Sequence, residues 1–198
     1  MAAPGPKLGF YINRRFVFLG KWLRHCGYYP SWNLRLLKRG QGEYERVSHT
    51  GETKSGDNEV HEHVLCAGPV GWLKQDMIHE AFPTIDVFME KHIRYSNWEA
   101  LVQYEDSRGG LPAHLLGHPL QRRRFLKRLV RRLPCRPTLR FLYSYVLRGG
   151  FLEGREGYVF CRLLAFYEFL CVAKYKELKV KARMARMGSD TSNHGLNE

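Results

Sequence analysis

The chain changes character near Pro119, and this change constrains its fold more than any other feature. Before it, short apolar stretches such as residues 8–19 alternate with Gly- and Pro-bearing turns, which predicts short strands. After it, acidic residues become scarce and longer apolar–basic stretches follow, which predicts helices. The sequence therefore predicts a strand-rich part at residues 8–105, a helical extension at 119–180 and a disordered tail at 188–198.

Turn residues refine the prediction for the first part. Gly and Pro indicate a loop at residues 27–30, and a short apolar strand follows at 34–37. Two short apolar pieces predict a hairpin around Gly68 and the proline after it. Thr84 can cap a helix that runs to about Tyr104, because its side chain can accept hydrogen bonds from the first free backbone N–H groups.

The segment LQRRRFLKRLVRRL, residues 120–133, is a strongly basic helix candidate. Its apolar residues form one stripe, and seven basic residues lie off that stripe without acidic partners. A solvated face and nucleic-acid binding are alternatives, but a helix in the plane of lipid headgroups fits best. The residues expected to contact anionic lipid are Arg123, Arg124, Lys127 and Arg128. Further helices are predicted at 139–147 and 157–178.

The charge balance predicts an anionic partner. Lys and Arg number 32 and Asp and Glu 19, so the net charge is +13. An aromatic content of 13% excludes a disordered polyelectrolyte. Because the chain carries no zinc-finger, basic-zipper or RNA-recognition signature, we expect no nucleic-acid partner. Its five cysteines show no C-x-x-C spacing, which argues against a zinc framework.

Histidine and glutamate gather at residues 61–63 and again at His79. The order H-E-H differs from the H-E-x-x-H of metalloproteases. Side chains of this kind most often stabilise a loop edge, but they can also supply a general base and a metal ligand. The chain has no P-loop, dinucleotide-binding or Asp-x-Asp motif of its own.

Several segments together share their order and spacing with a known enzyme family. They are FLGKWLRHCGYYPSWNLRLLKRGQGEYE (18–45), VHEHV (60–64), GPVGWLKQDMIHE (68–80) and FMEKHIRYSNWEA (88–100). Together they resemble the second half of inverting family 2 glycosyltransferases of the lipopolysaccharide-core and colanic-acid type. Residues 136–178 resemble the helical extension of the same subgroup, so the resemblance covers roughly residues 8–180.

The resemblance implies an α/β fold in which a partial glycosyltransferase A-type (Rossmann-like) domain precedes amphipathic C-terminal helices. Members of the family begin with a nucleotide-binding half that ends in an Asp-rich metal motif. This chain starts after that motif. We therefore expect the acceptor half alone, as a fragment, a split gene product or the result of a misplaced start codon, and expect it to be inactive by itself.

The resemblance also assigns roles by position. Gly27 matches a glycine loop near the acceptor, Glu62 matches the catalytic base, and His79 matches a late metal-ligating histidine. The remaining candidates would neutralise phosphate or stack on sugar rings: Arg35, Lys38, Tyr28, Tyr29 and Trp32. Each assignment has an alternative. The two cations can simply lie at a strand edge, and the three aromatic residues can belong to the core. Glu62 and His79 can tie a strand edge to a neighbouring loop.

These implications describe a glycosyltransferase that moves a sugar from a nucleotide-sugar donor to a lipid-linked saccharide in lipopolysaccharide or cell-surface polysaccharide biosynthesis. A divalent cation, Mg²⁺ or Mn²⁺, is expected in the complete enzyme, with none bound tightly by this chain alone. We expect a cytoplasmic protein that lies peripherally on the inner, anionic face of the cell membrane. The alternative is a non-catalytic peripheral membrane interaction protein derived from the same family.

Overall fold

The computed structural model describes residues 6–44, 64–108 and 135–194, with positions 125, 129, 130 and 133 in addition. The chain forms two compact units, and neither is continuous in sequence. The first unit consists of Met1–Phe88 and Arg148–Tyr158, and the second of Met89–Leu147 and Val159–Glu198. These units divide the chain differently from the predicted parts 8–105 and 119–180, whose roles stay predictions.

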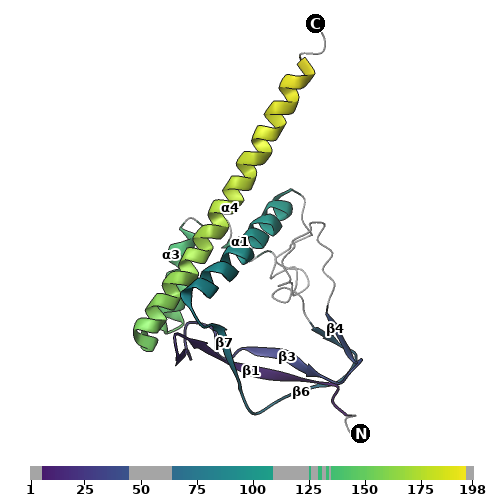
Figure 1. Cartoon of the computed structure of the whole chain (residues 1–198), viewed down its shortest axis with the longest axis vertical. Coiled ribbons are helices and arrows are strands. Elements are labelled where there is room, and N and C mark those ends of the chain that lie inside the picture. The colour runs from purple at the N-terminus through teal and green to yellow at the C-terminus, as the bar shows by residue number, and fades with distance from the viewer. Residues whose placement is uncertain are drawn as a thin grey trace. The chain divides into compact units, whose positions relative to one another are not determined.

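Strand β1 (Gly9–Phe18) is the centre of the sheet in the first unit (Figure 1). It pairs antiparallel with β2 (Lys21–Trp22) and β3 (Trp32–Leu37). It also pairs in parallel with β6 (Val70–Trp72) and β7 (Met77–Phe82). The strands at 8–19 and 34–37 are therefore confirmed, whereas β7 was not foreseen as a strand.

The two faces of β1 make different contacts. Successive side chains of a strand point to opposite faces, so Phe16 and Phe18 share one face and Asn13 and Arg15 the other. The phenylalanine face forms the core, where Phe16 lies 5.8 Å from Phe82 between ring centroids. Alternation near the end of β1 thus places Phe16 and Phe18 in the core, while Asn13 and Arg15 on the other face donate to Asp76.

The predicted hairpin around Gly68 is wrong. Strand β5 (Val64–Cys66) pairs with β4 (Gly42–Tyr44), and β6 pairs with β1 instead. The backbone N–H of Leu8 donates to the Pro69 carbonyl at 2.7 Å. A Cβ at Gly68 would lie 2.6 Å from the Leu8 side chain. These contacts hold residues 68–69 against the start of β1, so the chain continues there instead of folding back onto β5.

Helix α1 (Ile85–Ser107) begins as predicted. The backbone N–H of Val87 donates to the Thr84 hydroxyl at 3.2 Å, which satisfies one free donor of the first turn. The helix continues three residues beyond Tyr104. Its first turn, through Phe88, belongs to the first unit, and the rest belongs to the second.

The second unit is helical. It contains α3 (Arg136–Leu142), a π-helical turn at Tyr143–Leu147 and most of α4 (Gly154–His194), so the helices predicted near 139–147 and 157–178 are confirmed. Helix α4 also includes residues 188–194, which were expected to be disordered. A single glycine, Gly188, costs a helix only about 1 kcal/mol, and no proline follows to stop it. Residues 195–198 lie outside the described part.

Two buried or half-buried cations join the helices of this unit. Arg136 of α3 donates to Glu168 of α4 at 2.7 Å and to Gln103 of α1 at 3.3 Å. Lys174 of α4 donates to the Ile93 carbonyl at 2.8 Å, and also to Ser96 and Asn97. A cation at each junction therefore satisfies acceptors from a neighbouring helix.

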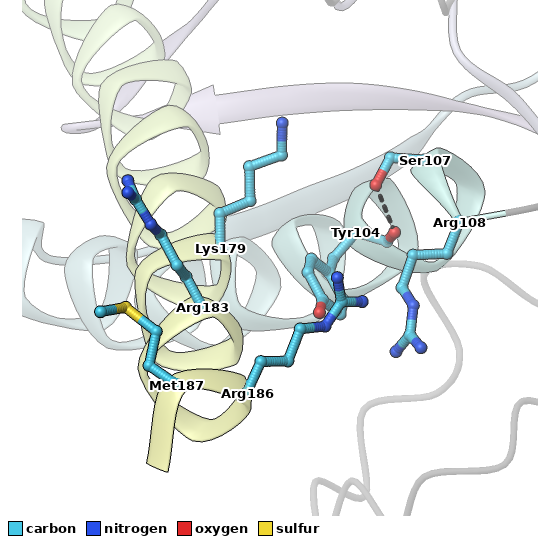
Figure 2. Close-up of a pocket in the computed structure, with 7 residues that line it drawn as sticks. All are labelled: Tyr104, Ser107, Arg108, Lys179, Arg183, Arg186 and Met187. Atoms are coloured by element: carbon cyan, nitrogen blue, oxygen red, sulfur yellow. Dashed lines mark hydrogen bonds between the residues drawn. The ribbon is translucent and has the colours of Figure 1, made fainter. Parts of the chain in front are cut away.

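A groove runs between the end of α1 and the far half of α4 (Figure 2). Its volume is about 300 Å³, and basic side chains dominate its lining. The residues that line it are Tyr104, Ser107, Arg108, Lys179, Arg183, Arg186 and Met187. Among the described residues, no helix is both long and apolar enough to cross a bilayer.

Candidate functional site

The loop between β2 and β3 carries three of the predicted site residues, and its conformation depends on glycine. Gly27 has a φ of +86°, in the left-handed region that favours glycine. A Cβ there would lie 3.3 Å from Nε of Arg148. The Cys26 N–H also donates to the Arg148 carbonyl at 3.0 Å. Gly27 therefore lets the loop turn closely against the returning segment 148–158.

Asp76 anchors this loop from the turn before β7. Asn13 donates to Asp76 Oδ1 at 2.8 Å, and Arg15 Nε donates to Oδ2 at 3.2 Å. The Tyr29 hydroxyl donates to Oδ2 at 3.1 Å. The Asn13 side-chain oxygen in turn accepts from the Ser31 N–H at 2.7 Å. One carboxylate therefore ties the loop, β1 and the β6–β7 turn together.

Asp76 is held as a carboxylate. Its side chain is only 12% exposed, and burial alone would raise its pKa. The hydrogen bonds from Asn13, Arg15 and Tyr29 outweigh burial and keep the pKa of Asp76 below its ordinary value. The carboxylate of this cluster is therefore charged at neutral pH.

The three aromatic residues predicted to stack on sugar rings differ in how far they are packed against other side chains. Tyr29 meets Trp22 edge to face at 5.3 Å, and Tyr28 packs on Phe16 at 4.8 Å. Trp32, at the start of β3, is 43% exposed. Of the three predicted stacking residues, Trp32 therefore offers the most open surface to a sugar ring.

Two guanidinium groups lie over Trp22, which the sequence analysis did not single out. The Arg15 guanidinium carbon is 4.7 Å from the ring centroid and that of Arg24 is 4.3 Å away. Such contacts orient arginine while leaving N–H donors for an anion. Arg15 also belongs to the Asp76 cluster, so the loop surface combines aromatic rings with fixed positive charge.

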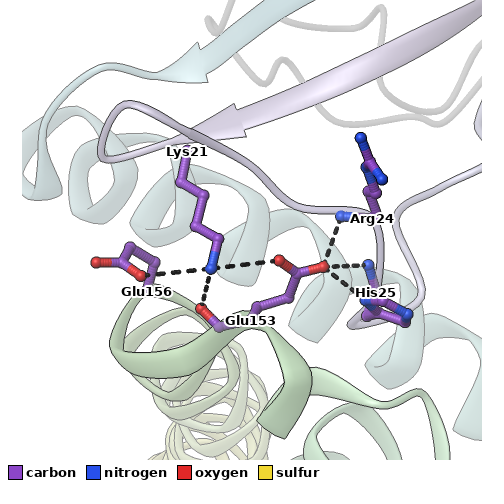
Figure 3. A network of polar contacts seen from close by, with 5 residues as sticks. All are labelled: Lys21, Arg24, His25, Glu153 and Glu156. Carbon is purple, nitrogen blue, oxygen red and sulfur yellow. Dashed lines mark hydrogen bonds and ion pairs between the residues drawn. The ribbon is translucent and has the colours of Figure 1, made fainter.

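Glu153 forms a second buried carboxylate cluster (Figure 3). It lies in the 3-10 turn Gly150–Glu153, and its Oε1 accepts from the backbone N–H groups of Arg24 and His25 at 2.8 and 2.9 Å. The same oxygen lies 2.6 Å from His25 Nδ1. Lys21 Nζ lies 3.6 Å from Glu153 Oε2 and 3.7 Å from Glu156 Oε2. The returning segment is thereby tied to the start of the predicted acceptor loop.

The Glu153 cluster has a defined charge and orientation. Burial would raise the pKa of Glu153, but the bonds from His25 and the two backbone N–H groups hold it below its ordinary value. With Nδ1 engaged by Glu153, His25 can meet a further partner only through Nε2. A carboxylate–imidazole pair of this kind can orient the ring for hydrogen bonding or proton exchange.

The other predicted residues lie farther along the sheet. His79 is on β7, with its ring 6.4 Å from Phe16, so Phe16 contacts both His79 and Tyr28. Arg35 on β3 is exposed, and its charge acts with the larger effect of burial to lower the pKa of Arg14. Lys38 follows β3 and is also exposed. These residues stay candidates.

The predicted divalent cation belongs to the complete enzyme, and the structure of this chain does not test it. None of the described His, Cys, Asp and Glu side chains form a group of three or more that could hold a metal ion. The role of His79 as a metal ligand in the complete enzyme stays a prediction, and we derive no step through a metal. Glu62 and the lipid-contact residues Arg123, Arg124, Lys127 and Arg128 lie outside the described part.

The two carboxylate clusters were missed at the level of sequence. Asp76 has Glu80 four residues away, and Glu153 has Glu156 three residues away, so nothing local marks either acid as the one that is buried. Sequence alone does not say which acidic side chain finds buried donors. His25 was not among the predicted site residues.

The chain is similar to a curated protein, the lipopolysaccharide core biosynthesis glycosyltransferase LpsC of Rhizobium meliloti (strain 1021). The two are 28% identical over 190 residues, which cover 92% of this chain and 58% of that protein. This chain thus spans little more than half the length of its relative. No family model matches the sequence, and no solved structure matches it. The similarity supports a relationship to glycosyltransferases.

Proposed function

We propose that the chain is the acceptor-side part of an inverting family 2 glycosyltransferase. It would serve transfer of a sugar from a nucleotide-sugar donor to a lipid-linked saccharide in lipopolysaccharide-core or related polysaccharide biosynthesis. The observation that carries the proposal is the similarity to LpsC over 92% of the chain. The mixed α/β fold is consistent with it, although the partial A-type domain itself stays part of the proposal.

The loop at residues 23–31 supports an acceptor role. Asp76 and Glu153 hold it from two sides with charged hydrogen bonds, which limits its freedom before any ligand arrives. Preorganisation of this kind lowers the entropic cost of binding. Trp32 presents an exposed ring beside it, and Arg24 adds a cation that suits a phosphorylated sugar. We assign the acceptor to this surface.

Acceptor binding is the direct test. The full chain is titrated with core oligosaccharide released from lipopolysaccharide, and tryptophan fluorescence is followed. We expect saturable binding that Trp32→Ala weakens by about tenfold, since loss of a stacked ring removes on the order of 1–1.5 kcal/mol. Trp72→Ala is the matched control, because Trp72 is exposed on β6 but is stacked on Tyr11. Absence of any oligosaccharide binding would contradict the proposal.

Donor binding tests the acceptor-side assignment separately. Because the chain carries no phosphate-binding turn and no Asp-rich motif, we expect no measurable heat with uridine or guanosine diphosphate sugars. Under this proposal the divalent cation, Mg²⁺ or Mn²⁺, belongs to the complete enzyme. Micromolar affinity of this chain for any nucleotide sugar would show that the assignment to the acceptor side is wrong.

Glu62 is the proposed base that removes the proton from the acceptor hydroxyl. Where transfer is reconstituted, Glu62→Gln should lower turnover by about 10²- to 10⁴-fold and keep donor affinity, since an amide cannot accept the proton. Glu80→Gln, an exposed glutamate on β7, is the control. Near-normal turnover of Glu62→Gln per folded molecule would remove the assignment.

His79→Ala should weaken metal-dependent donor binding if His79 is a ligand there.

A further inference from the structure

Glu153 makes one ring nitrogen of His25 a hydrogen-bond donor. His25 Nδ1 lies 2.6 Å from Glu153 Oε1. Burial would raise the pKa of Glu153, but the bonds it accepts hold that pKa below its ordinary value, so at neutral pH it is a carboxylate that can only accept. The proton of this bond therefore belongs to Nδ1. In the neutral ring the other nitrogen, Nε2, then carries a lone pair and no proton.

Glu153 does not need the ring as a partner. Its Oε1 already accepts from the backbone N–H groups of Arg24 and His25 at 2.8 and 2.9 Å, and its Oε2 lies 3.6 Å from Lys21 Nζ. A carboxylate oxygen has about two lone-pair sites, so the two backbone groups satisfy Oε1. The imidazole is a third donor to the same oxygen. The contact therefore fixes the orientation of the ring more than it satisfies the carboxylate.

The Nε2 side of the His25 ring points away from Glu153 (Figure 3). The His25 side chain is 42% exposed, whereas that of Glu153 is 6% exposed. Within the part of the chain that the structure describes, the hydrogen bonds of the ring are made at Nδ1 and none at Nε2. A Cβ at Gly149 would lie 3.2 Å from His25 Cδ2, the ring atom bonded to Nε2. The glycine therefore keeps side-chain atoms away from this edge of the ring.

The charged groups around the ring leave Nε2 as an acceptor among donors. The two acidic residues of the cluster, Glu153 and Glu156, share Lys21, whose Nζ lies 3.6 and 3.7 Å from them. Arg24 lies over an indole ring at 4.3 Å, and the Arg148 side chain packs against the loop. Both guanidinium groups can only donate. A ligand of this surface must therefore bring a donor for Nε2.

We propose that His25 binds a hydroxyl group of the saccharide acceptor through Nε2, and that Glu153 is the positioning residue that holds the ring for this contact. The inference rests on the proposed function, because it names a contact of the acceptor surface at residues 23–31. A phosphate dianion or a carboxylate brings no proton to Nε2, whereas a hydroxyl donates to it and can still accept through its oxygen. The proton stays on the hydroxyl in this contact, so Glu62 keeps its proposed role as the base.

Two substitutions of His25 separate the roles of its two nitrogens. His25→Asn keeps an amide N–H near the Nδ1 position, where it can donate to Glu153, but has no atom at the Nε2 position. His25→Gln places an amide group near the Nε2 position and leaves Glu153 without the Nδ1 donor. The full chain and both variants are titrated with core oligosaccharide, and urea unfolding of each is measured beside the binding.

We expect the two variants to differ in opposite directions. His25→Asn should weaken oligosaccharide binding about five- to tenfold, which is the value of one hydrogen bond, and should keep most of the stability. His25→Gln should keep more of the affinity and lose more of the stability. If the ring only ties Glu153 to the loop, both variants bind normally per folded molecule, and that result would overturn the inference.

The same titration separates this inference from the proposed function. Oligosaccharide binding by the unchanged chain that His25→Asn leaves intact removes His25 from the acceptor surface and leaves the proposed function standing. A chain that binds no oligosaccharide contradicts the proposed function itself, and the inference is overturned with it.

The tautomer of the ring tests Glu153 as the positioning residue. Nitrogen-15 NMR of the full chain shows which ring nitrogen of His25 carries the proton, and we expect Nδ1, with a shift of the Nε2 signal when oligosaccharide is added. Glu153→Gln keeps an oxygen for the backbone N–H groups but removes the charge, so it should lower both the fraction of this tautomer and the affinity. Glu156→Gln is the matched control, because Glu156 contacts Lys21 and not the ring, and it should change neither. A proton on Nε2 in the unchanged chain, or a tautomer that Glu153→Gln leaves as it was, would overturn the role of Glu153.

Discussion

In each unit, charged side chains connect segments that are far apart in sequence, and the sign of the charge differs between the two units. In the first unit the buried centres are carboxylates, Asp76 and Glu153, each surrounded by donors from several segments. In the second unit the centres are cations, Arg136 and Lys174, which satisfy acceptors on neighbouring helices. The donors to Asp76 are side chains and those to Glu153 include two backbone N–H groups, whereas Arg136 and Lys174 donate mainly to side-chain oxygens. The first unit holds 11 of the chain's 19 acidic residues and 13 of its 32 basic ones, so most of the surplus positive charge belongs to the second unit.

The largest effect is expected for Glu153→Ala in the first unit. The change removes the acceptor of the Arg24 and His25 backbone N–H groups and of the His25 and Lys21 side chains. We expect the free energy of unfolding to fall by about 3 kcal/mol. Urea unfolding measures the loss, and amide hydrogen exchange assigns it to residues 9–26. Glu156→Gln is the control, because its part-exposed pair with Lys21 should contribute less than about 1 kcal/mol. Equal effects of the two changes would argue against Glu153 as a centre.

Arg136→Met should have the next largest effect, and it acts in the second unit. Removing the cation leaves Glu168 and Gln103 without a donor, so we expect a loss of about 2 kcal/mol. Adding Glu168→Leu should restore stability to within about 1 kcal/mol, since apolar residues can replace a buried ion pair. Urea unfolding of both variants checks this. The double variant could instead be less stable than Arg136→Met. The Arg136–Glu168 pair would then stabilise the unit by more than the cost of leaving one charge unpaired.

Asp76→Asn should cost about 1–2 kcal/mol and change the response to acid. The folded-state pKa of Asp76 is lowered, so its contribution is fully present above the unfolded value of about 3.9 and is lost as the pH falls through the folded value. Urea unfolding between about pH 5 and 2 should therefore show a smaller acid loss in the variant than in the unchanged chain. Glu80→Gln, exposed on β7, should keep the full acid loss. Parallel acid curves for Asp76→Asn and the unchanged chain would contradict a charged centre.

The smallest effect is expected for Lys174→Met, at about 1 kcal/mol near neutral pH. Burial lowers the pKa of Lys174, so the folded state releases this proton before the unfolded state does. Stability should then rise with pH between the folded value and the unfolded value of about 10.4. Unfolding free energies measured up to pH 10.5 should show this rise in the unchanged chain and not in Lys174→Met. A rise that persists in the variant would come from another group.

Local signals in the sequence identified β1, the loop at Gly27, the Thr84 cap and the long C-terminal helices. Each depends on contacts within a few residues, where alternation, capping and turn residues act directly. The pairing of residues 68–82 with β1 was missed, because it depends on contacts about 60 residues apart that no local pattern records. The same holds for Asp76 and Glu153, whose donors come from 47 to 63 and from 128 to 132 positions away.

The resemblance to glycosyltransferases and the structure inform different parts of the site. Gly27, Tyr28 and Tyr29 lie in one loop, whose anchors Asp76 and Glu153 only the structure identifies. His79 and Tyr28 both lie against the Phe16 ring, which neither spacing nor resemblance indicated. Glu62 stays a prediction from resemblance, because the described residues resume two positions after it.

The first unit is discontinuous, and this has a consequence for how the protein is made. Glu153, which holds residues 24–25, emerges from the ribosome more than 120 residues after them. Until then the loop at Gly27 lacks one of its two anchors, although β1 can already pair with β7. Synthesis should therefore pass through a state in which the sheet is formed and the loop is not yet fixed. Any shortened chain that ends before residue 153 would keep that unfinished loop permanently.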